Sequence, residues 1–303
     1  MIRTKVFARV GELIQGKLGR DQHVIIPGII SNHFYTETFI DNVPVGEELK
    51  PKPKKALEIF LKLKEGKALE DIQVDELEIP HLRILDHKYY ITQVSNIPYG
   101  KGFTSISADC LSLLKALNHY FETNFSIETL YQIASKVTVV DPCLQDEIDQ
   151  IFDPISGTRV FHLPELELCA LYFDANHEGI VNPEVMISKL IYESDEEERF
   201  DALLTSFQEG LITGELNAIY TATLESAKIN QRFNPKPKFN LLKEFAEQNG
   251  VGLFVSHVGS MMGLIGEEKK MQVLSESFKV YCKKHWMTRV YASKSCLDQP
   301  VLI

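Results

Sequence analysis

The spacing of hydrophobic and polar positions changes along the chain between a strand-like period and a helix-like one. Runs with strand character occupy 4–10, 23–26 and 34–40. Alternation of apolar and polar residues over such short runs is typical of strands that pack one face on a core. Gly11 and Gly16 bracket one further apolar pair, so we expect that pair to form a separate short piece.

Helical spacing begins farther along the chain. Ala56, Ile59, Phe60 and Leu63 fall on one face of a helix that ends near Gly66. The same analysis predicts helices over 106–121, 127–136, 194–210, 216–230, 240–248 and 271–284, and strands over 89–95, 159–162, 167–173, 252–257 and 288–292.

Hydroxyl side chains precede two of these helices. Ser126 stands before 127–136, and Thr104 or Ser105 stands at the start of 106–121. A hydroxyl oxygen at this position can accept a hydrogen bond from a free N–H group of the first helical turn. We therefore expect these residues to cap the two helices.

The mixture of strands and helices with long connections predicts an α+β fold. At roughly 150 residues per domain, a chain of this length suggests two domains or one large one. A turn-rich cluster at 153–157 is the best candidate for a boundary. We therefore expect an N-terminal domain over 1–157 and a C-terminal domain over 158–303.

Composition excludes several classes of protein. The 303 residues are 44% hydrophobic and 24% charged, as in ordinary globular proteins, and the net charge is −10. That charge argues against nucleic acid or an anionic membrane as a partner, because both attract a basic face. The sequence has no apolar stretch long enough for a membrane span, and its start does not resemble a secretory signal. We therefore expect a cytoplasmic protein.

A glycine loop between a strand and a helix, at 97–109, is the strongest candidate for chemistry. A helix N-terminus has unpaired N–H groups and a partial positive charge. Glycines such as Gly100 and Gly102 let the backbone approach a ligand closely. The pattern therefore favours phosphate binding, and the alternative is a plain capped helix after a turn.

Three other segments have weaker claims. Residues 11–18 have the GxxxxGK spacing of a P-loop, but Leu18 stands where a Ser or Thr must reach Mg²⁺. Asp141 follows a buried apolar run and could act as a base, although an Asp-Pro pair more often forms a turn. His257 lies in a turn rich in small residues between two apolar runs, where a structural role is the commoner one.

Taken in order, these motifs resemble those of the GHMP kinase superfamily, which includes galactokinase, homoserine kinase and mevalonate kinase. The resemblance is greatest to the L-threonine kinases of cobalamin biosynthesis. It is carried by Gly-Glu-Leu-Ile-Gln-Gly at 11–16, the loop at 98–109, Ala-Thr-Leu at 222–224, Pro-Lys-Pro at 235–237 and Ser-His-Val-Gly-Ser at 256–260. It spans nearly the whole chain.

The resemblance implies a two-domain fold, with a ribosomal-S5-like nucleotide-binding domain followed by a ferredoxin-like domain. ATP would lie between them with Mg²⁺, and its γ-phosphoryl group would pass to the hydroxyl of L-threonine or a related hydroxy amino acid. A second copy of the chain, in a homodimer, is a further expected partner. Asp141 would orient or deprotonate the acceptor. ATP would be bound by Pro98, Lys101, Gly102, Thr104, Ser105 and Ser107, the acceptor by Glu12, Gln15, His257, Gly259 and Ser260, and the metal by Ser105 and Asp109.

The chain departs from the pattern of the superfamily at positions that concern magnesium. Ile106 stands where the loop usually has a second serine, and an isoleucine cannot bind a metal ion. A glutamate that precedes the aspartate in the threonine kinases is also missing before Asp141, and Asp109, Asp146 and Glu147 are candidate substitutes. Two alternatives therefore stay open: a kinase of this fold with another acceptor, such as serine, homoserine or a specialised alcohol, and a non-catalytic ligand-binding homologue.

Overall fold

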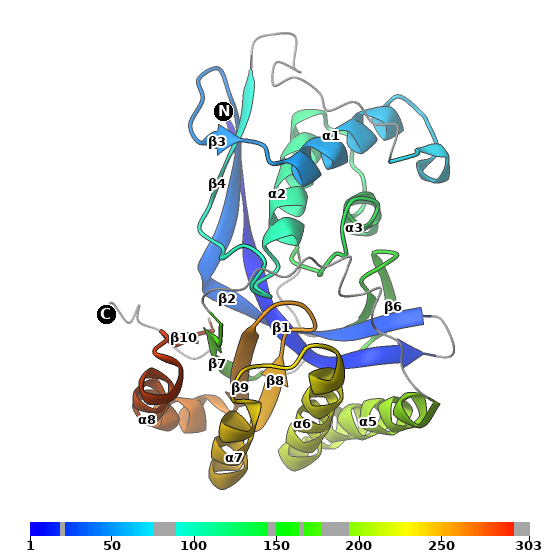
Figure 1. Cartoon of the computed structure of the whole chain (residues 1–303). Coiled ribbons are helices and arrows are strands. Elements are labelled where there is room, and N and C mark those ends of the chain that lie inside the picture. Colours follow the sequence, from blue (N-terminus) through cyan, green and yellow to red (C-terminus); the bar gives the residue numbers. More distant parts are fainter. Residues whose placement is uncertain (19–21, 75–88, 145–149, 164–166, 177–193, 294–303) are drawn as a thin grey trace.

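A computed structural model of the chain describes residues 1–18, 22–74, 89–144, 150–163, 167–176 and 194–293. Figure 1 shows these residues as one sheet with helices packed beside it in two groups. None of the described helices is long and apolar enough to cross a membrane.

Two long antiparallel strands form the centre of the sheet. β1 (Ile2–Leu18) and β2 (Gln22–Asp41) pair from Ile2↔Ile40 to Leu18↔Gln22. The sequence prediction of separate short strands here was wrong, because the glycines do not end pairing. Irregularities in the register between Phe7 and Arg9, and between Glu12 and Ile14, absorb the break in alternation instead.

The remaining strands extend this ribbon on both sides, in the order β10-β7-β9-β8-β1-β2-β4-β3. β5 pairs with β2 and β6 off this path. β1 and β8 meet at Glu12↔Val255, so the sheet continues from the N-terminal half of the chain into the C-terminal half. The strands are β3 (Glu47–Glu48), β4 (Tyr90–Ser95), β5 (Gln150–Asp153), β6 (Thr158–His162), β7 (Cys169–Asp174), β8 (Gly252–Val255), β9 (Met261–Gly266) and β10 (Tyr291–Ala292).

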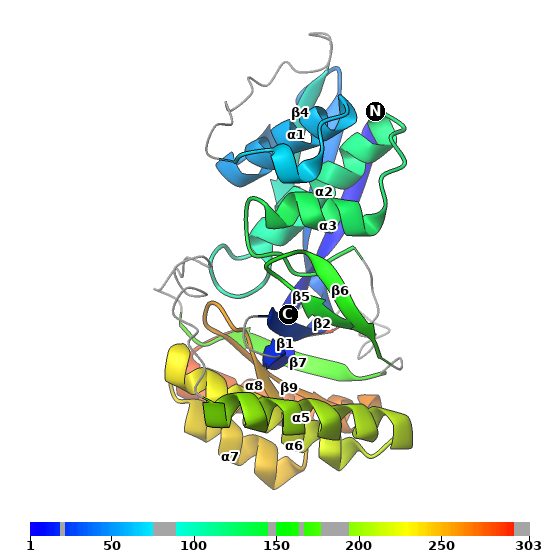
Figure 2. The same ribbon diagram turned by 90° about the vertical axis from the view of Figure 1, so that its right-hand side faces the viewer.

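The helices lie in the two groups that Figures 1 and 2 show, one beside the upper part of the ribbon and one below the sheet. In the first group α2 packs against β1 and β2, and α1 packs on α2. In the second, α5 and α6 lie under β1 while α8 contacts β7 and β9. The helices are α1 (Pro51–Lys64), α2 (Ser105–Tyr120), α3 (Ile127–Ser135), α5 (Ser194–Thr213), α6 (Leu216–Phe233), α7 (Phe239–Asn249) and α8 (Glu268–Trp286), and η1 (Leu69–Asp71) is a short 3-10 turn.

All of the helices predicted from the sequence are present, with ends that differ by a few residues. The Ser126 cap is confirmed, since its hydroxyl accepts a hydrogen bond from the Thr129 N–H group at 3.1 Å. The expected cap of α2 is wrong. Thr104 occupies the N-cap position in a left-handed conformation, and its side chain makes no cap hydrogen bond.

Buried apolar side chains form two clusters. The larger one fills the space between the β1–β2 ribbon and helices α1, α2 and α3, and reaches α5 and α6. The smaller one lies between the sheet and helices α7 and α8. Both helix groups therefore pack on the same sheet. The segment before α2 and the turn after β8 are in contact, because Ser260 and Met261 donate to the Lys101 carbonyl.

Candidate active site

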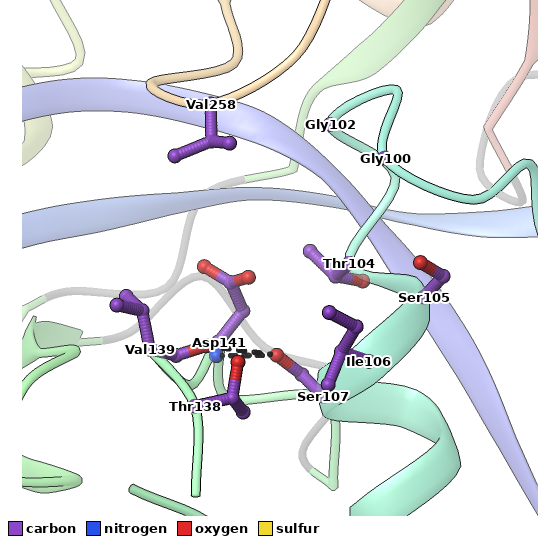
Figure 3. Close-up of a pocket in the computed structure, with 10 residues that line it drawn as sticks. All are labelled: Gly100, Gly102, Thr104, Ser105, Ile106, Ser107, Thr138, Val139, Asp141 and Val258. Atoms are coloured by element: carbon purple, nitrogen blue, oxygen red, sulfur yellow. Dashed lines mark hydrogen bonds between the residues drawn. The ribbon is translucent and has the colours of Figure 1, made fainter. Parts of the chain in front are cut away.

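The segment between β4 and α2 forms one wall of a pocket. The first backbone hydrogen bond of α2 runs from the Ala108 N–H to the Thr104 carbonyl at 3.0 Å. The N–H groups of Ser105, Ile106 and Ser107 therefore have no partner inside the helix. All three residues line the pocket, as Figure 3 shows, together with Gly100, Gly102, Thr104, Thr138, Val139, Asp141 and Val258.

The glycine loop is held against a turn from the other half of the chain. The Lys101 carbonyl accepts hydrogen bonds from the N–H groups of Ser260 and Met261, both at 3.0 Å. A Cβ atom on Gly102 would lie 2.3 Å from Ser256 Oγ, and one on Gly259 would lie 2.2 Å from the Lys101 carbonyl carbon. Only glycine at both positions allows this close approach, at φ values of +87° and +89°.

Asp141 faces the pocket from the segment that follows α3. Its backbone N–H donates to Ser107 Oγ at 3.1 Å, which ties the segment to the first turn of α2. Burial, followed by the negative charge of Glu12, raises the pKa of the Asp141 carboxyl to about 7. The positive charges of His257 and Arg9 act in the opposite direction. A carboxyl with this pKa can take up a proton near neutral pH.

Glu12 and His257 form a buried pair beside Asp141. Glu12 comes from β1, and its carboxylate accepts from the His257 backbone N–H at 2.6 Å. Glu12 Oε1 also lies 2.8 Å from His257 Nδ1. Burial alone would lower the pKa of His257, but the charges of Glu12 and Asp141 together with the hydrogen bond to Glu12 outweigh it, so the pKa is raised. These groups therefore favour the protonated imidazole, which lies beside two carboxyl groups.

Two buried cations complete this cluster, and the sequence analysis assigned a role to neither. Arg9 is fully buried on β1 and donates to the carbonyls of Pro142 at 2.6 Å and Gly28 at 2.7 Å. Lys236 donates to the carbonyls of Ser256 at 2.8 Å and Gly259 at 2.6 Å. Burial lowers the pKa of Lys236 to about 7, and the charge of Glu12 opposes that effect. The sequence signal for Arg9 was a charged residue inside the apolar run 6–10.

Gln15 lies deeper, where β1 meets α6. Its side-chain oxygen accepts from Asn230 Nδ2 at 2.9 Å, and its backbone N–H donates to Ser226 Oγ at 3.0 Å. Gln15 Nε2 and Asn230 Oδ1 are both buried without a hydrogen-bond partner. One buried donor and one buried acceptor therefore stand unpaired between β1 and α6.

The side chains of two predicted site residues, Lys101 and Ser260, bind other residues and do not line the pocket. Lys101 is expected to neutralise phosphate charge, but its ammonium group donates to the Asn176 carbonyl at 2.5 Å and lies 3.6 Å from Asp174. Ser260 likewise donates its hydroxyl to Asp174. Thr104 lines the pocket, but its hydroxyl bridges to β1: it accepts from the Arg9 N–H at 2.9 Å and donates to the Arg9 carbonyl. Pro98, the remaining predicted ATP contact, is half-buried at the start of the loop.

The predicted metal ligands differ in how well they fit a magnesium ion. Asp109 is buried within α2, where its carboxylate pairs with Lys50 at 2.8 Å and accepts from Thr36 at 2.6 Å. Both carboxylate oxygens of Asp109 are therefore occupied by Lys50 and Thr36, so Asp109 does not fit a metal at the pocket. Ser105 fits better, because it lines the pocket beside the free N–H groups of α2. The substitutes at 146 and 147 lie outside the described residues.

Glu12, Asp141 and His257 have ligand-type atoms within 4.8 Å of one another. Their charges are already balanced, however, because Glu12 is paired with His257 and because Arg9 and Lys236 act on the same carboxyl groups. Buried carboxylates that are matched by cations have no net charge left to attract another one. We interpret the group as an ion-pair cluster.

Comparison with known proteins gives the class of this fold. Residues 66–143 match the family of GHMP kinases N terminal domains. The 4-diphosphocytidyl-2-C-methyl-D-erythritol kinase of Caldicellulosiruptor bescii is 24% identical over 205 residues, which are 64% of this chain and 66% of that enzyme. The match thus leaves about a third of the relative's length uncovered.

Solved structures match over nearly the whole chain. Mevalonate pyrophosphate decarboxylase from Streptococcus pyogenes aligns with a TM-score of 0.64 and 15% identity, over 99% of this chain and 98% of its own. Homoserine kinase from Cytophaga hutchinsonii aligns with a TM-score of 0.62 and 14% identity, over 96% and 94%. The mevalonate kinase of Methanococcus jannaschii aligns with a TM-score of 0.64 and 11% identity, over 96% and 97%.

The α+β fold expected from the sequence is therefore the GHMP-kinase fold, and that expectation is confirmed. Sequence similarity to GHMP kinases covers residues 66–143, which match the N-terminal domain family, and the 205 residues aligned with the methylerythritol kinase. The relatives named above take their names from mevalonate, homoserine and methylerythritol compounds. These comparisons do not single out the threonine kinases.

Proposed function

We propose that the protein is an ATP-dependent kinase that phosphorylates the hydroxyl group of a small molecule. The observation that carries this proposal is the meeting of free N–H groups at the start of α2 with the buried Asp141 carboxyl in one pocket. A helix N-terminus attracts phosphate oxygens, and a carboxyl with a pKa near neutrality can accept a proton. Phosphoryl transfer requires both groups to face the same small space.

Each residue has a part in the reaction that follows from its position. The N–H groups of Ser105, Ile106 and Ser107 bind oxygens of the terminal phosphates of ATP. The acceptor oxygen forms a bond to the γ-phosphorus while its O–H bond breaks and the proton passes to Asp141. The bond from the γ-phosphorus to the bridging oxygen breaks, and its electron pair stays on ADP. The isoleucine at 106 is compatible with phosphate binding, because its contribution is a backbone N–H.

Magnesium is the proposed metal, and it neutralises charge on the β- and γ-phosphates when bound with ATP. Ser105 is the residue whose hydroxyl would help to hold it, because Mg²⁺ prefers oxygen ligands. A solved structure of the same fold, with a TM-score of 0.58 and 15% identity, is a complex with AMPPCP and magnesium. That complex supports ATP and Mg²⁺ as the cofactors here.

For the acceptor we propose L-threonine or a related hydroxy amino acid. One feature supports a small polar acceptor: an unpaired donor on Gln15 and an unpaired acceptor on Asn230 are buried between β1 and α6. A hydroxy amino acid offers both donors and acceptors to such a pair. The homodimer stays a prediction.

The purified protein, mixed with ATP and Mg²⁺, should be tested against a panel of hydroxy amino acids and small alcohols. Release of ADP and ³¹P NMR of the products are the measurements. A new phosphomonoester signal with a hydroxy amino acid is the expected result. ATP binding without ADP release above the blank for every acceptor would show a non-catalytic homologue, and a signal with a different alcohol would change the acceptor alone.

Asp141→Asn tests the proposed proton acceptor. We expect kcat to fall by roughly 10²–10⁴-fold, the usual range for a lost general base, while ATP affinity is unchanged. In the unchanged protein, activity should be lost as the pH falls through about 7, because protonated Asp141 cannot accept the proton. Asp71→Asn, at an exposed position in η1, is the control. Equal loss of ATP binding and turnover would show that Asp141 is structural.

A further inference from the structure

The Glu12–His257 pair lies next to Asp141 but is not among the residues that line the pocket. Val258 lines that pocket, but neither Glu12 nor His257 does. Both side chains are nonetheless almost completely buried, at 3% and 6% exposure. A buried ion pair adds little net stability, because the loss of hydration offsets the attraction between the two charges. Its position next to a carboxyl that does face the pocket therefore calls for an explanation.

The pair is fixed in place from several elements. Glu12 lies where β1 meets β8, opposite Val255. The turn that carries His257 is held by Lys236 and by Asn234, whose side chain donates to the His257 carbonyl at 3.1 Å and to the Gly259 carbonyl at 2.9 Å. The backbone of His257 is thus fixed by these bonds, and its Nδ1 lies 2.8 Å from Glu12 Oε1.

We propose that Glu12 and His257 are positioning residues for Asp141: Glu12 holds the imidazolium of His257 beside the Asp141 carboxylate, and this fixed positive charge keeps Asp141 in its proton-accepting form. The inference rests on the proposed function and adds the means by which a buried aspartate can serve it. Without such a charge, burial and the neighbouring Glu12 carboxylate would leave Asp141 protonated and unable to take the acceptor's proton.

The surrounding charges agree with this assignment. Glu12 raises the pKa of Asp141, and His257 is the first of the groups that lower it, ahead of Arg9 and the Ser107 hydroxyl. The groups that face Asp141 or His257 come from every element packed around them: Arg9 and Glu12 on β1, His23 on β2, Ser107 on α2, Cys143 beside Asp141, and Lys236 before α7. Arg9 also donates to the Pro142 and Gly28 carbonyls. His257, in contrast, has its Nδ1 2.8 Å from Glu12, and ligand-type atoms of His257 and Asp141 lie within 4.8 Å of each other.

His257→Asn is the informative variant, because its amide can still donate to Glu12 while the positive charge is gone. The first measurement is the titration of the Asp141 carboxyl carbon by ¹³C NMR, assigned with Asp141→Asn. An opposite charge at this range lowers the pKa of an aspartate by about 1–3 units, so the midpoint in His257→Asn should rise by at least about one unit. His119→Gln, an exposed histidine near the end of α2, should leave the midpoint unchanged.

The second measurement is the pH profile of kcat/KM. In His257→Asn the acid limb should move to higher pH, with a loss of about tenfold at pH 6.5 that recovers by pH 9. His257→Gln provides a second variant without the charge should His257→Asn fail to fold. A uniform loss at all pH values, or an unchanged Asp141 midpoint, would overturn the inference. A shifted midpoint in a protein with no turnover would overturn the proposed function and leave the role of the pair standing.

Discussion

At the scale of single residues, Ile106 belongs both to the core and to the pocket. Its side chain lies partly buried against the larger core cluster and also lines the pocket. It therefore serves the core packing of α2 with one part of its surface while its N–H faces the proposed phosphate site. A serine at this position would lose the apolar packing and add a hydroxyl oxygen that can bind a metal ion. Core packing and metal binding can therefore be measured separately.

Ile106→Ser should lower the Mg²⁺ concentration that gives half-maximal turnover, because it adds a hydroxyl beside Ser105. It should also lower the free energy of unfolding by about 1 kcal/mol, since a half-buried apolar side chain is lost. Turnover against Mg²⁺ concentration and denaturant unfolding are the two measurements. Ile106→Val is the control, and it should leave the Mg²⁺ dependence unaltered. The same Mg²⁺ dependence in all three proteins would exclude a metal-binding role for this position.

At the scale of elements, the glycine loop and the turn at 256–260 behave as one unit. The loop carries the proposed phosphate site, and the turn carries His257. The turn leaves no space for a side chain on Gly102, and the loop leaves none for a side chain on Gly259. A change in either segment should therefore disturb both.

Gly102→Ala should lower the free energy of unfolding by more than about 2 kcal/mol, because a left-handed φ strains alanine by roughly 1–2 kcal/mol and because Ser256 and the Val258 carbonyl occupy the space. Gly66→Ala is the matched control. Gly66 has a φ of +92°, but no atom lies within 4 Å of its Cβ position. Denaturant unfolding of both variants separates backbone strain from crowding, and equal losses would mean that the loop and the turn are not closely packed.

The elements also show what could be predicted from the sequence. Helix positions were predictable, because a period of 3.6 depends only on local spacing. The β1–β2 ribbon was not, because the β-irregularities that preserve pairing across Gly11 depend on the partner strand. The sequence motifs identified Asp141 and His257 as candidates, but they did not predict which residues the Lys101 and Asp109 side chains contact. Those contacts are made with Asp174 and Lys50, which lie far away in the sequence.

At the scale of the whole molecule, the two groups of helices are connected through one continuous sheet and through the contacts of the loop and turn. Lys236 contributes to that connection from the segment between α6 and α7. Its side-chain nitrogen donates to two carbonyls of the turn, so its loss removes a donor from Ser256 and leaves the Gly259 carbonyl with Asn234.

Lys236→Met should lower stability by roughly 2 kcal/mol near pH 9. The folded-state pKa of Lys236 is about 7, below the usual 10.5, so the unfolded chain binds more protons between these values. The contribution of Lys236 to stability should therefore grow as the pH rises from 7 to 10, and the difference in Tm between wild type and variant should widen. Lys270→Met is the control, because it removes an exposed lysine that also donates to a carbonyl. A constant difference in Tm would show that Lys236 stays charged throughout.

The bond between Glu12 and His257 joins residues that are 245 positions apart. During synthesis on a ribosome, β1 emerges early and can pair at once with β2, but Glu12 has to wait until almost all of the chain has been translated before its partner exists. The pocket, which Val258 also lines, is therefore incomplete until the turn at 256–260 has been made. A nascent chain that already contains the whole glycine loop would still lack the turn on which that loop rests, so we expect the proposed ATP site to form only late in translation.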